Sequence, residues 1–179
     1  MIRTPTLFVL GAGASHPYGF PCGAKLRSLI CDAASDHNPA NRALVELGFE
    51  AEAVRNIASE FQDSNVPSID AFLSRRPDLV EIGKHVIAAN LCCEENPTAI
   101  SSEETKDHWY RYLWSRLIED TDSPHQLINN EVRFISFNYD RSLEYFLYVS
   151  TKRTYGVDDA LALKCSAAVD PRLWSAWRF

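Results

Sequence analysis

The sequence predicts a layered α/β domain with a helical insertion, and three observations lead to this prediction. Two short apolar runs, residues 6–10 and 132–137, have the composition of buried parallel strands. The first run ends in a glycine-containing loop, and the second ends in a polar loop followed by an expected helix over residues 141–152. The long segment between the runs has helical patterns and exceeds a simple crossover, which favours a helical insertion after the first βα unit.

The first part of this segment is expected to form several helices. A helix over residues 24–31 places its larger apolar residues on one face. Residues 40–61 are expected to form one or two further helices, with a break near Gly48. Ser68 is suited to capping a short helix over residues 69–74.

The second part continues with two longer helices and a loop. Pro77 suits the first turn of a helix that runs to about Cys93, and a polar loop over residues 94–101 follows. Ser101 and Glu104 match a capping box and are expected to open the next helix. That helix would bury an apolar stripe made of Tyr110, Leu113, Trp114, Leu117 and Ile118.

Composition and charge exclude several classes of protein. The chain has 179 residues, 46% hydrophobic and 23% charged, as an ordinary soluble domain has. A net charge of −6 argues against nucleic acid or an anionic membrane as a partner. No apolar run approaches the roughly 20 residues of a membrane span, and the run at residues 7–10 is too short for a signal peptide. We therefore expect a cytoplasmic protein.

The five cysteines indicate neither a zinc site nor a redox motif. Their number is odd, their spacing is irregular and none forms a C-x-x-C pair. We expect reduced thiols, mostly buried as small apolar residues, and no bound metal. The cysteines are Cys22, Cys31, Cys92, Cys93 and Cys165.

A glycine-containing loop follows the first strand directly. It reads Gly11-Ala12-Gly13-Ala14-Ser15. In dinucleotide-binding folds, glycines at this point let backbone N–H groups approach a pyrophosphate closely. An ordinary strand-end turn would show the same pattern, because His16 stands where the third glycine of G-x-G-x-x-G belongs.

A second polar loop follows the other strand, with the sequence Ser136-Phe137-Asn138-Tyr139-Asp140. Ligands of open α/β sheets bind at the carboxyl ends of the strands, so Asn138 and Asp140 are candidate site residues. Asp140 is also suited to capping the helix that follows. The two roles of Asp140 are compatible.

Together with Gly19-Phe20-Pro21 and the run Ser68-Ile69-Asp70-Ala71-Phe72-Leu73, these two loops resemble the sirtuin-like NAD-binding family. The chain is more similar to the bacterial antiphage-defence branch than to the protein deacylases. The resemblance spans roughly residues 6–150 and has the motifs in the family's order. It implies a Rossmann-like parallel sheet that binds NAD and cleaves the bond between ribose and nicotinamide.

The resemblance also implies roles for single residues. Asn138 would position water or the ribose at the scissile bond, and Asp140 would lie near the nicotinamide amide. Cleavage of such a glycosidic bond passes through an oxocarbenium-like state, which needs polar groups that orient the ribose and the leaving group. The cofactor-binding residues would be Gly11, Ala12, Gly13, Ala14, Ser15, Gly19, Phe20 and Pro21, with the pyrophosphate at Ala12, Gly13 and Ser15.

Several departures separate this chain from the deacylases. Cys22-Gly23-Ala24 stands where the deacylases have Asp-Phe-Arg, Phe137 replaces a glutamine, and the four-cysteine zinc module is absent. The family's catalytic histidine follows the Asn-x-Asp loop, whereas all five histidines here precede Asn138. The last glycine is Gly156, so a later glycine loop is missing as well.

These absences predict a sirtuin-like NAD-binding domain over residues 1–155 that is truncated at its C-terminal side. Residues 156–179 are then an atypical tail, without a recognisable strand or helix period from residue 163 on. A sheet without its last strands has an open edge and uncovered apolar surface, which favours a homo-oligomer. Trp174 and Trp177 of the tail are expected to cover that surface or to form the contact.

Two functions are compatible with these features. The first is an NAD+ glycohydrolase-type domain of bacterial antiphage defence. The second is a non-catalytic module that binds NAD or ADP-ribose or serves in assembly, including an inactive truncated product. The missing histidine favours the second function for this chain, and the departures listed above disfavour a protein deacylase.

Overall fold

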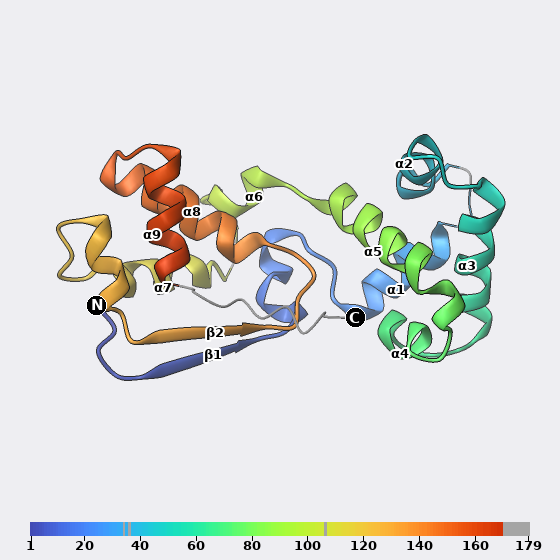
Figure 1. Cartoon of the computed structure of the whole chain (residues 1–179), viewed down its shortest axis with the longest axis horizontal. Helices are drawn as coiled ribbons and strands as arrows, with labels where there is room; N and C mark the ends of the chain where they lie inside the picture. Colours follow the sequence, from blue (N-terminus) through green and yellow to red (C-terminus); the bar gives the residue numbers. More distant parts are fainter. Residues whose placement is uncertain (34, 36, 106, 170–179) are drawn as a thin grey trace. The chain divides into compact units, whose positions relative to one another are not determined.

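A computed structural model describes residues 1–33, 35, 37–105 and 107–169 of the chain. It shows a mixed α/β protein that is mostly helical and contains a two-stranded parallel sheet (Figure 1). The described residues form two compact units. The first contains Met1–Tyr18 and the described residues from Asn96 onward, and the second contains Gly19–Glu95. The domain boundaries expected from the sequence, 1–155 and 156–179, stay a prediction.

The sheet belongs to the first unit and consists of β1 (Thr6–Leu10) and β2 (Val132–Ser136). The strands are parallel, and their register pairs Thr6 with Val132 and Leu10 with Ser136. Both predicted strands are therefore confirmed, although β2 ends one residue earlier than expected. Because the strands run in the same direction, the glycine loop and the Asn138 loop leave the sheet at the same edge.

One face of the sheet packs against helix α7 (Trp109–Ile118). Phe8 of β1 stacks on Phe134 of β2 with ring centroids 5.2 Å apart, and the Trp109 ring lies 6.5 Å from that of Phe8. The opposite face of β1 is open: Leu7 is 56% and Val9 is 61% exposed. The expectation of a fully buried strand is wrong for these two residues, since in the described part of the chain nothing buries them.

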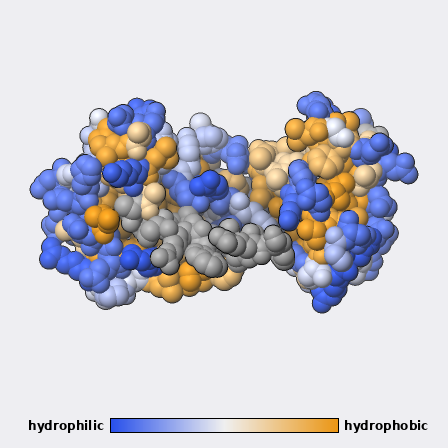
Figure 2. All heavy atoms as spheres, in the orientation of Figure 1, coloured by the Kyte–Doolittle hydropathy of each residue, from blue (hydrophilic) through white to orange (hydrophobic). Residues whose placement is uncertain are grey.

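The exposed apolar face of β1 supports the prediction of a homo-oligomer. Apolar atoms gather along the border of the molecule beside β1 (Figure 2). We expect the chain to self-associate in sedimentation experiments, and the double variant Leu7→Thr/Val9→Thr to sediment as a smaller species, because threonine keeps the strand preference while removing apolar surface. A monomeric unmodified chain would contradict this expectation. The proposed role of Trp174 and Trp177 lies outside the described residues.

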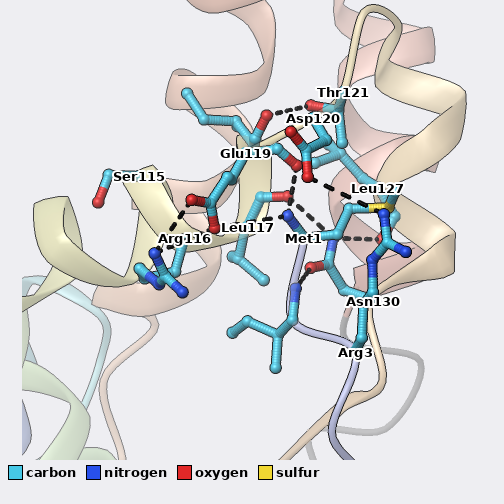
Figure 3. A network of polar contacts seen from close by, with 12 residues as sticks. Met1, Arg3, Ser115, Arg116, Leu117, Glu119, Asp120, Thr121, Leu127 and Asn130 are labelled. Atoms are coloured by element: carbon cyan, nitrogen blue, oxygen red, sulfur yellow. Dashed lines mark hydrogen bonds and ion pairs between the residues drawn. The ribbon is translucent and has the colours of Figure 1, made fainter.

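The start of β1 is held beside the start of β2 by a polar network around Asn130 (Figure 3). The backbone N–H of Ile2 donates to Oδ1 of Asn130 at 2.7 Å. The Asn130 amide nitrogen donates to the carbonyl oxygens of Leu117 and Leu127, both at 3.0 Å. The Met1 ammonium group contacts Glu119 in the same network. Asn130 is 4% exposed, and both its amide oxygen and its NH₂ group are hydrogen-bonded. It thus links the segment before β1 to the segment before β2.

The remaining elements of the first unit differ from the sequence prediction in one region. The predicted loop over residues 94–101 is wrong, because Pro97–Ser101 forms the short helix α6, with the Asn96 side chain as its cap. Ser101 therefore ends a helix, and the predicted capping box with Glu104 is wrong too: α7 begins at Trp109. The expected apolar stripe of α7 is buried at Tyr110, Leu113, Trp114 and Leu117, while Ile118 is half-buried.

Two helices complete this unit after β2. Helix α8 (Ser142–Tyr155) confirms the helix expected over residues 141–152, and it buries Leu143, Phe146 and Leu147. Helix α9 (Asp159–Val169) follows the left-handed Gly156 and packs against α8 (Figure 1). The expectation that residues from 163 on lack a helical pattern is therefore wrong up to residue 169. The helix is rich in alanine and leucine, which favour helix without an amphipathic period.

In the second unit, the described residues form helices as predicted. The break near Gly48, whose φ is +96°, separates the helix that ends at Glu46 from the helix that begins at Ala51. The Ser68 side chain accepts the backbone N–H of Ala71 at the start of the next helix. Its core contains Leu44, Ile57 and Phe61. The helices are α1 (Gly23–Asp32), α2 (Pro39–Glu46), α3 (Ala51–Asp63), α4 (Ile69–Leu73) and, after a 3₁₀ turn at Pro77–Leu79, α5 (Val80–Glu94).

Two expectations from composition can be compared with the structure. Within the described residues, no helix combines the length and the apolar character needed to cross a membrane. All five cysteines are free thiols, but only Cys165 is buried, and Cys92 and Cys93 are exposed. The expectation of mostly buried cysteines is wrong because Cys92 and Cys93 lie at the exposed end of α5.

Candidate functional site

Ser15 joins the two loops that leave the carboxyl ends of the strands. Its hydroxyl donates to Oδ2 of Asp140 at 2.7 Å, and the amide nitrogen of Asn138 donates to Ser15 Oγ at 3.3 Å. Ser15 is 1% exposed, so these hydrogen bonds are largely withdrawn from water. The structure therefore brings together three residues predicted to act at one site.

The carboxylate of Asp140 accepts hydrogen bonds from three protein donors. Besides Ser15, the backbone N–H of Ser142 donates to Oδ1 at 3.0 Å, and the hydroxyl of Ser142 donates to the same oxygen. Ser142 is the first residue of α8, so Asp140 accepts the first backbone N–H of this helix, although the N-cap position belongs to Arg141, whose side chain makes no cap hydrogen bond. Asp140 thus links the glycine loop to the start of α8.

Tyr110 extends this network from α7. Its hydroxyl lies 2.7 Å from Ser142 Oγ, and because the single hydroxyl hydrogen of Ser142 is directed to Asp140, Tyr110 is the donor. Burial is the main cause that raises the pKa of Tyr110, which keeps its hydroxyl protonated for this role. A run of hydrogen bonds therefore extends from Tyr110 through Ser142 and Asp140 to Ser15 and Asn138.

The side-chain oxygen of Asn138 stands out in this network. The hydroxyl hydrogen of Ser15 points to the Asp140 carboxylate, so Ser15 Oγ can only accept a hydrogen bond from Asn138. The group of Asn138 that contacts Ser15 is therefore its NH₂ group. This leaves Oδ1 of Asn138 buried and without a hydrogen bond, alone among the buried side-chain nitrogen and oxygen atoms of the described residues. A buried acceptor without a partner destabilises a fold by about 1–3 kcal/mol, so Oδ1 of Asn138 is a hydrogen-bonding group that the protein itself leaves unused.

A pocket of about 490 Å³ lies at this position in the first unit. Its walls come from the end of β2 and the loop that follows, from α8 and from α9. The volume is within the range of small-molecule sites. The residues lining it are Ser136, Asn138, Tyr139, Asp140, Arg141, Glu144, Leu147, Tyr148, Leu163, Ser166 and Ala167.

The charged groups of the pocket lie in different environments. Burial is the main cause that raises the pKa of Glu144, and the neighbouring charge of Asp140 raises it further. Arg141 opposes this shift, with its Nε at 3.4 Å from Oε1 of Glu144. At the far wall, the Tyr148 hydroxyl and the Lys152 ammonium group both donate to Asp159, which fastens α9 to α8.

The glycine loop is held by hydrogen bonds to the protein, while its two glycines are exposed to solvent. Residues Ala12–Ala14 form a 3₁₀ turn in which the N–H of Ala14 donates to Gly11 at 2.8 Å, and the indole N–H of Trp109 donates to the carbonyl of Ala14 at 2.7 Å. Gly11 and Gly13 are exposed, and a Cβ built on either would meet no atom within 4 Å. The loop thus has free space for a ligand, although none of its residues lines the pocket.

The predicted residues Gly19, Phe20 and Pro21 belong to the second unit. Gly19 has a φ of +95°, which favours glycine, while Phe20 and Pro21 are buried. Their participation in the same ligand site as Ser15, Asn138 and Asp140 stays a prediction.

Tyr18 and His108 hold the end of the segment that follows the glycine loop. The hydroxyl of Tyr18 accepts the backbone N–H of Tyr110 at 2.9 Å and lies 3.3 Å from Nδ1 of His108. Because Nε2 of His108 faces the Ile100 carbonyl at 2.9 Å, Nε2 carries the proton and Nδ1 accepts the Tyr18 hydroxyl. Burial is the main cause that raises the pKa of Tyr18 to about 12, so the hydroxyl remains a donor.

This arrangement predicts destabilisation by mild acid. Burial is the main cause that lowers the pKa of His108, so the folded protein binds a proton at this position less readily than the unfolded chain. The resulting stability is complete above about pH 6.5, the ordinary histidine value, and is lost as the pH falls through the lower folded value. We expect melting curves between pH 7.5 and 5 to show a larger loss for the unmodified protein than for His108→Asn, whose amide oxygen can replace Nδ1. Equal losses would contradict this role.

No histidine lines the pocket. Among the described residues, His108 uses both ring nitrogens for Tyr18 and Ile100, and His16, His37, His85 and His125 do not line the pocket either. The structure therefore offers no substitute for the histidine that the sirtuin-like resemblance implies.

Sequence reasoning missed Glu144 and the contribution of α9. Glu144 lies in the first turn of α8, directly after the loop that contains Asn138 and Asp140, and this closeness in the sequence was the available signal. Leu163, Ser166 and Ala167 could not be found from sequence, because their contribution depends on how α9 packs against α8.

Comparisons with protein-family models, curated proteins and solved structures found no match for this chain. The functional interpretation therefore rests on the residues of the pocket and the two loops.

Proposed function

We propose that the carboxyl edge of the sheet binds NAD, with the nicotinamide riboside part in the pocket and the pyrophosphate over Gly11–Ser15. In this proposal the two strands belong to a Rossmann-like sheet of a sirtuin-like domain. The activity would be NAD+ glycohydrolysis, in the setting of bacterial antiphage defence. Water would attack the anomeric carbon of the ribose, nicotinamide would leave with the electron pair of the glycosidic bond, and one proton would be released.

The observation that carries this proposal is Asn138, which lines the pocket and has a buried Oδ1 without a hydrogen-bond partner. A buried acceptor of this kind is suited to a ligand that brings its own donors. The nicotinamide riboside end of NAD has two ribose hydroxyls and a carboxamide NH₂, each of which can donate to Oδ1. In this proposal, binding of one of these donors would supply the hydrogen bond that Oδ1 lacks.

The chemistry of Asn138 also suits the reaction. Positive charge develops on the ribose in an oxocarbenium-like transition state, and a neutral amide can orient a hydroxyl or a water molecule without changing its protonation. The hydrogen bond from Asn138 to Ser15 fixes the orientation of the amide. Asp140, held by three donors, holds Ser15 in place for that contact.

A second function, non-catalytic binding of NAD or ADP-ribose, is favoured by a different observation. The described residues that line the pocket include no histidine, so the catalytic histidine that the resemblance implies is missing. Such a module would use the same loops and the same pocket without releasing nicotinamide. Chromatographic detection of nicotinamide therefore separates the two functions.

The variant Ala167→Trp tests whether the pocket is the ligand site. Ala167 is exposed, lies on α9 and lines the pocket, so an indole ring would occupy the pocket without entering the protein core. We expect titration calorimetry to show at least a roughly tenfold loss of NAD affinity, equivalent to about 1.4 kcal/mol.

Ala160→Trp is the matched control, because Ala160 is an exposed alanine of the same helix that does not line the pocket. This variant is expected to bind NAD like the unmodified chain. Equal binding of NAD by both tryptophan variants would place the ligand elsewhere, and absence of NAD and ADP-ribose binding by the unmodified chain would refute both candidate functions.

A further inference from the structure

The charges of the pocket are distributed unevenly between its interior and the solvent. Asp140 and Glu144 contribute two carboxylates to the lining, and Arg141 contributes one guanidinium group. The side chain of Arg141 is 82% exposed, whereas that of Glu144 is 28% exposed. The positive charge therefore lies largely in water, where it is screened, and the negative charges lie closer to the ligand space.

The two carboxylates are not equivalent. Asp140 already accepts three hydrogen bonds from the protein, which hold its oxygens toward Ser15 and Ser142. Glu144 has a contact of 3.4 Å with Arg141, through Oε1, and lies partly withdrawn from solvent. Of the two groups, Glu144 is the carboxylate that is suited to face a ligand.

We propose that Glu144 makes this pocket selective for the cationic pyridinium ring of NAD+ over the neutral dihydropyridine ring of NADH. The proposal rests on the proposed function, because it assumes that the nicotinamide end occupies the pocket. It assigns a role to a residue outside the two sequence motifs.

The physical basis is the charge difference between the two ligands. NAD+ and NADH share the adenosine, the pyrophosphate and both riboses, and differ in the charge and planarity of one ring. A carboxylate in a partly desolvated pocket attracts the pyridinium ring and leaves the neutral ring almost unaffected. The burial that raises the pKa of Glu144 also reduces screening of this attraction. The lining residues Leu147 and Leu163 add apolar wall, which accepts either ring and so does not oppose the selectivity.

The experiment is titration calorimetry of the 179-residue chain with NAD+ and with NADH at pH 8, where carboxylates are ionised. We expect NAD+ to bind about tenfold more tightly than NADH, as expected for one partly screened charge pair. Glu144→Gln keeps the size of the side chain and should bring the ratio of the two affinities to within about twofold, mainly by weakening NAD+.

Two further variants make the result specific. Glu103→Gln removes the same charge from a glutamate that is 89% exposed and lies outside the pocket lining, and it should keep the full NAD+ preference. Arg141→Gln keeps the Glu144 carboxylate and removes a positive charge that is 82% exposed, so it should retain the NAD+ preference. This variant also provides a test if Glu144→Gln does not fold, because loss of the preference in a folded Arg141→Gln protein would contradict the role of Glu144.

The outcomes separate this inference from the proposed function. Equal binding of NAD+ and NADH, or tighter binding of NADH, would overturn the selectivity while leaving the NAD site in place. A full NAD+ preference in a folded Glu144→Gln protein would overturn the role of Glu144. If neither dinucleotide binds, the proposed function itself fails, and the inference fails with it.

Discussion

Asn138→Ala is expected to abolish any nicotinamide release by the protein while leaving the melting temperature nearly unchanged. The substitution removes one hydrogen bond to Ser15, and it also removes the buried oxygen that has no partner. These two changes have opposite effects on stability and are each about 1 kcal/mol, so their sum is small. The loss of NAD turnover follows because, among the described residues, no other asparagine or glutamine side chain lines the pocket to orient the ribose.

Asp140→Ala is expected to lower both NAD turnover and stability. The variant leaves the hydroxyls of Ser15 and Ser142 and the backbone N–H of Ser142 without their acceptor. Hydrogen bonds to a charged group contribute about 1.5–3 kcal/mol each, and partial rescue by water leaves an expected loss of roughly 2–4 kcal/mol. The contrast between the two variants distinguishes a ligand-directed amide from a carboxylate that organises the site.

The measurements are NAD consumption by chromatography beside a thermal melt, with calorimetric NAD binding for the 179-residue chain. Asn129→Ala is a suitable control, because Asn129 is exposed and lies outside the pocket lining. Substantial turnover by a well-folded Asn138→Ala protein would end the proposed mechanism. A lack of turnover in the unmodified 179-residue chain would instead agree with the non-catalytic function, since its pocket lining contains no histidine.

Gly13→Val is expected to abolish NAD binding without unfolding the protein. Gly13 is exposed, its φ is not positive, and an added Cβ would meet no protein atom within 4 Å, so valine fits the chain itself. The side chain would occupy the space in which the phosphate oxygens approach the backbone in the proposed complex. Gly13→Ala adds less volume and should weaken binding to an intermediate degree.

Titration calorimetry and thermal melts of both Gly13 variants test this prediction. Ala160→Val adds a similar apolar volume at an exposed position of α9 outside the pocket lining, and it should bind NAD normally. Unchanged affinity in Gly13→Val would show that the pyrophosphate does not lie over the glycine loop. A Gly13→Val protein that melts far below the unmodified chain would show that the glycine has a structural role instead.

The sequence by itself determined most of the local structure. The strands at residues 6–10 and 132–136 and helices α1, α3, α7 and α8 follow from apolar periodicity, and the cap at Ser68 follows from local chemistry. These features depend on residues a few positions apart, which is the range over which periodicity and capping act. The wrong prediction for residues 94–101 also has a local cause, because two possible helix caps, Asn96 and Ser101, lie close together. Asn96 is the cap that is used: with Pro97 at the next position it begins α6, and Ser101 ends that helix.

The sequence also placed Asn138 and the glycine loop at one edge of the sheet, because parallel strands end on the same side. Only the tertiary structure showed that Ser15 is hydrogen-bonded to Asp140, which lies 125 positions later in the sequence. It also showed that Oδ1 of Asn138 has no hydrogen-bond partner. It alone placed Glu144 and α9 around the pocket and left Leu7 and Val9 exposed. These features arise from contacts between distant segments, whose side-chain directions are decided by packing and not by any pattern along the chain.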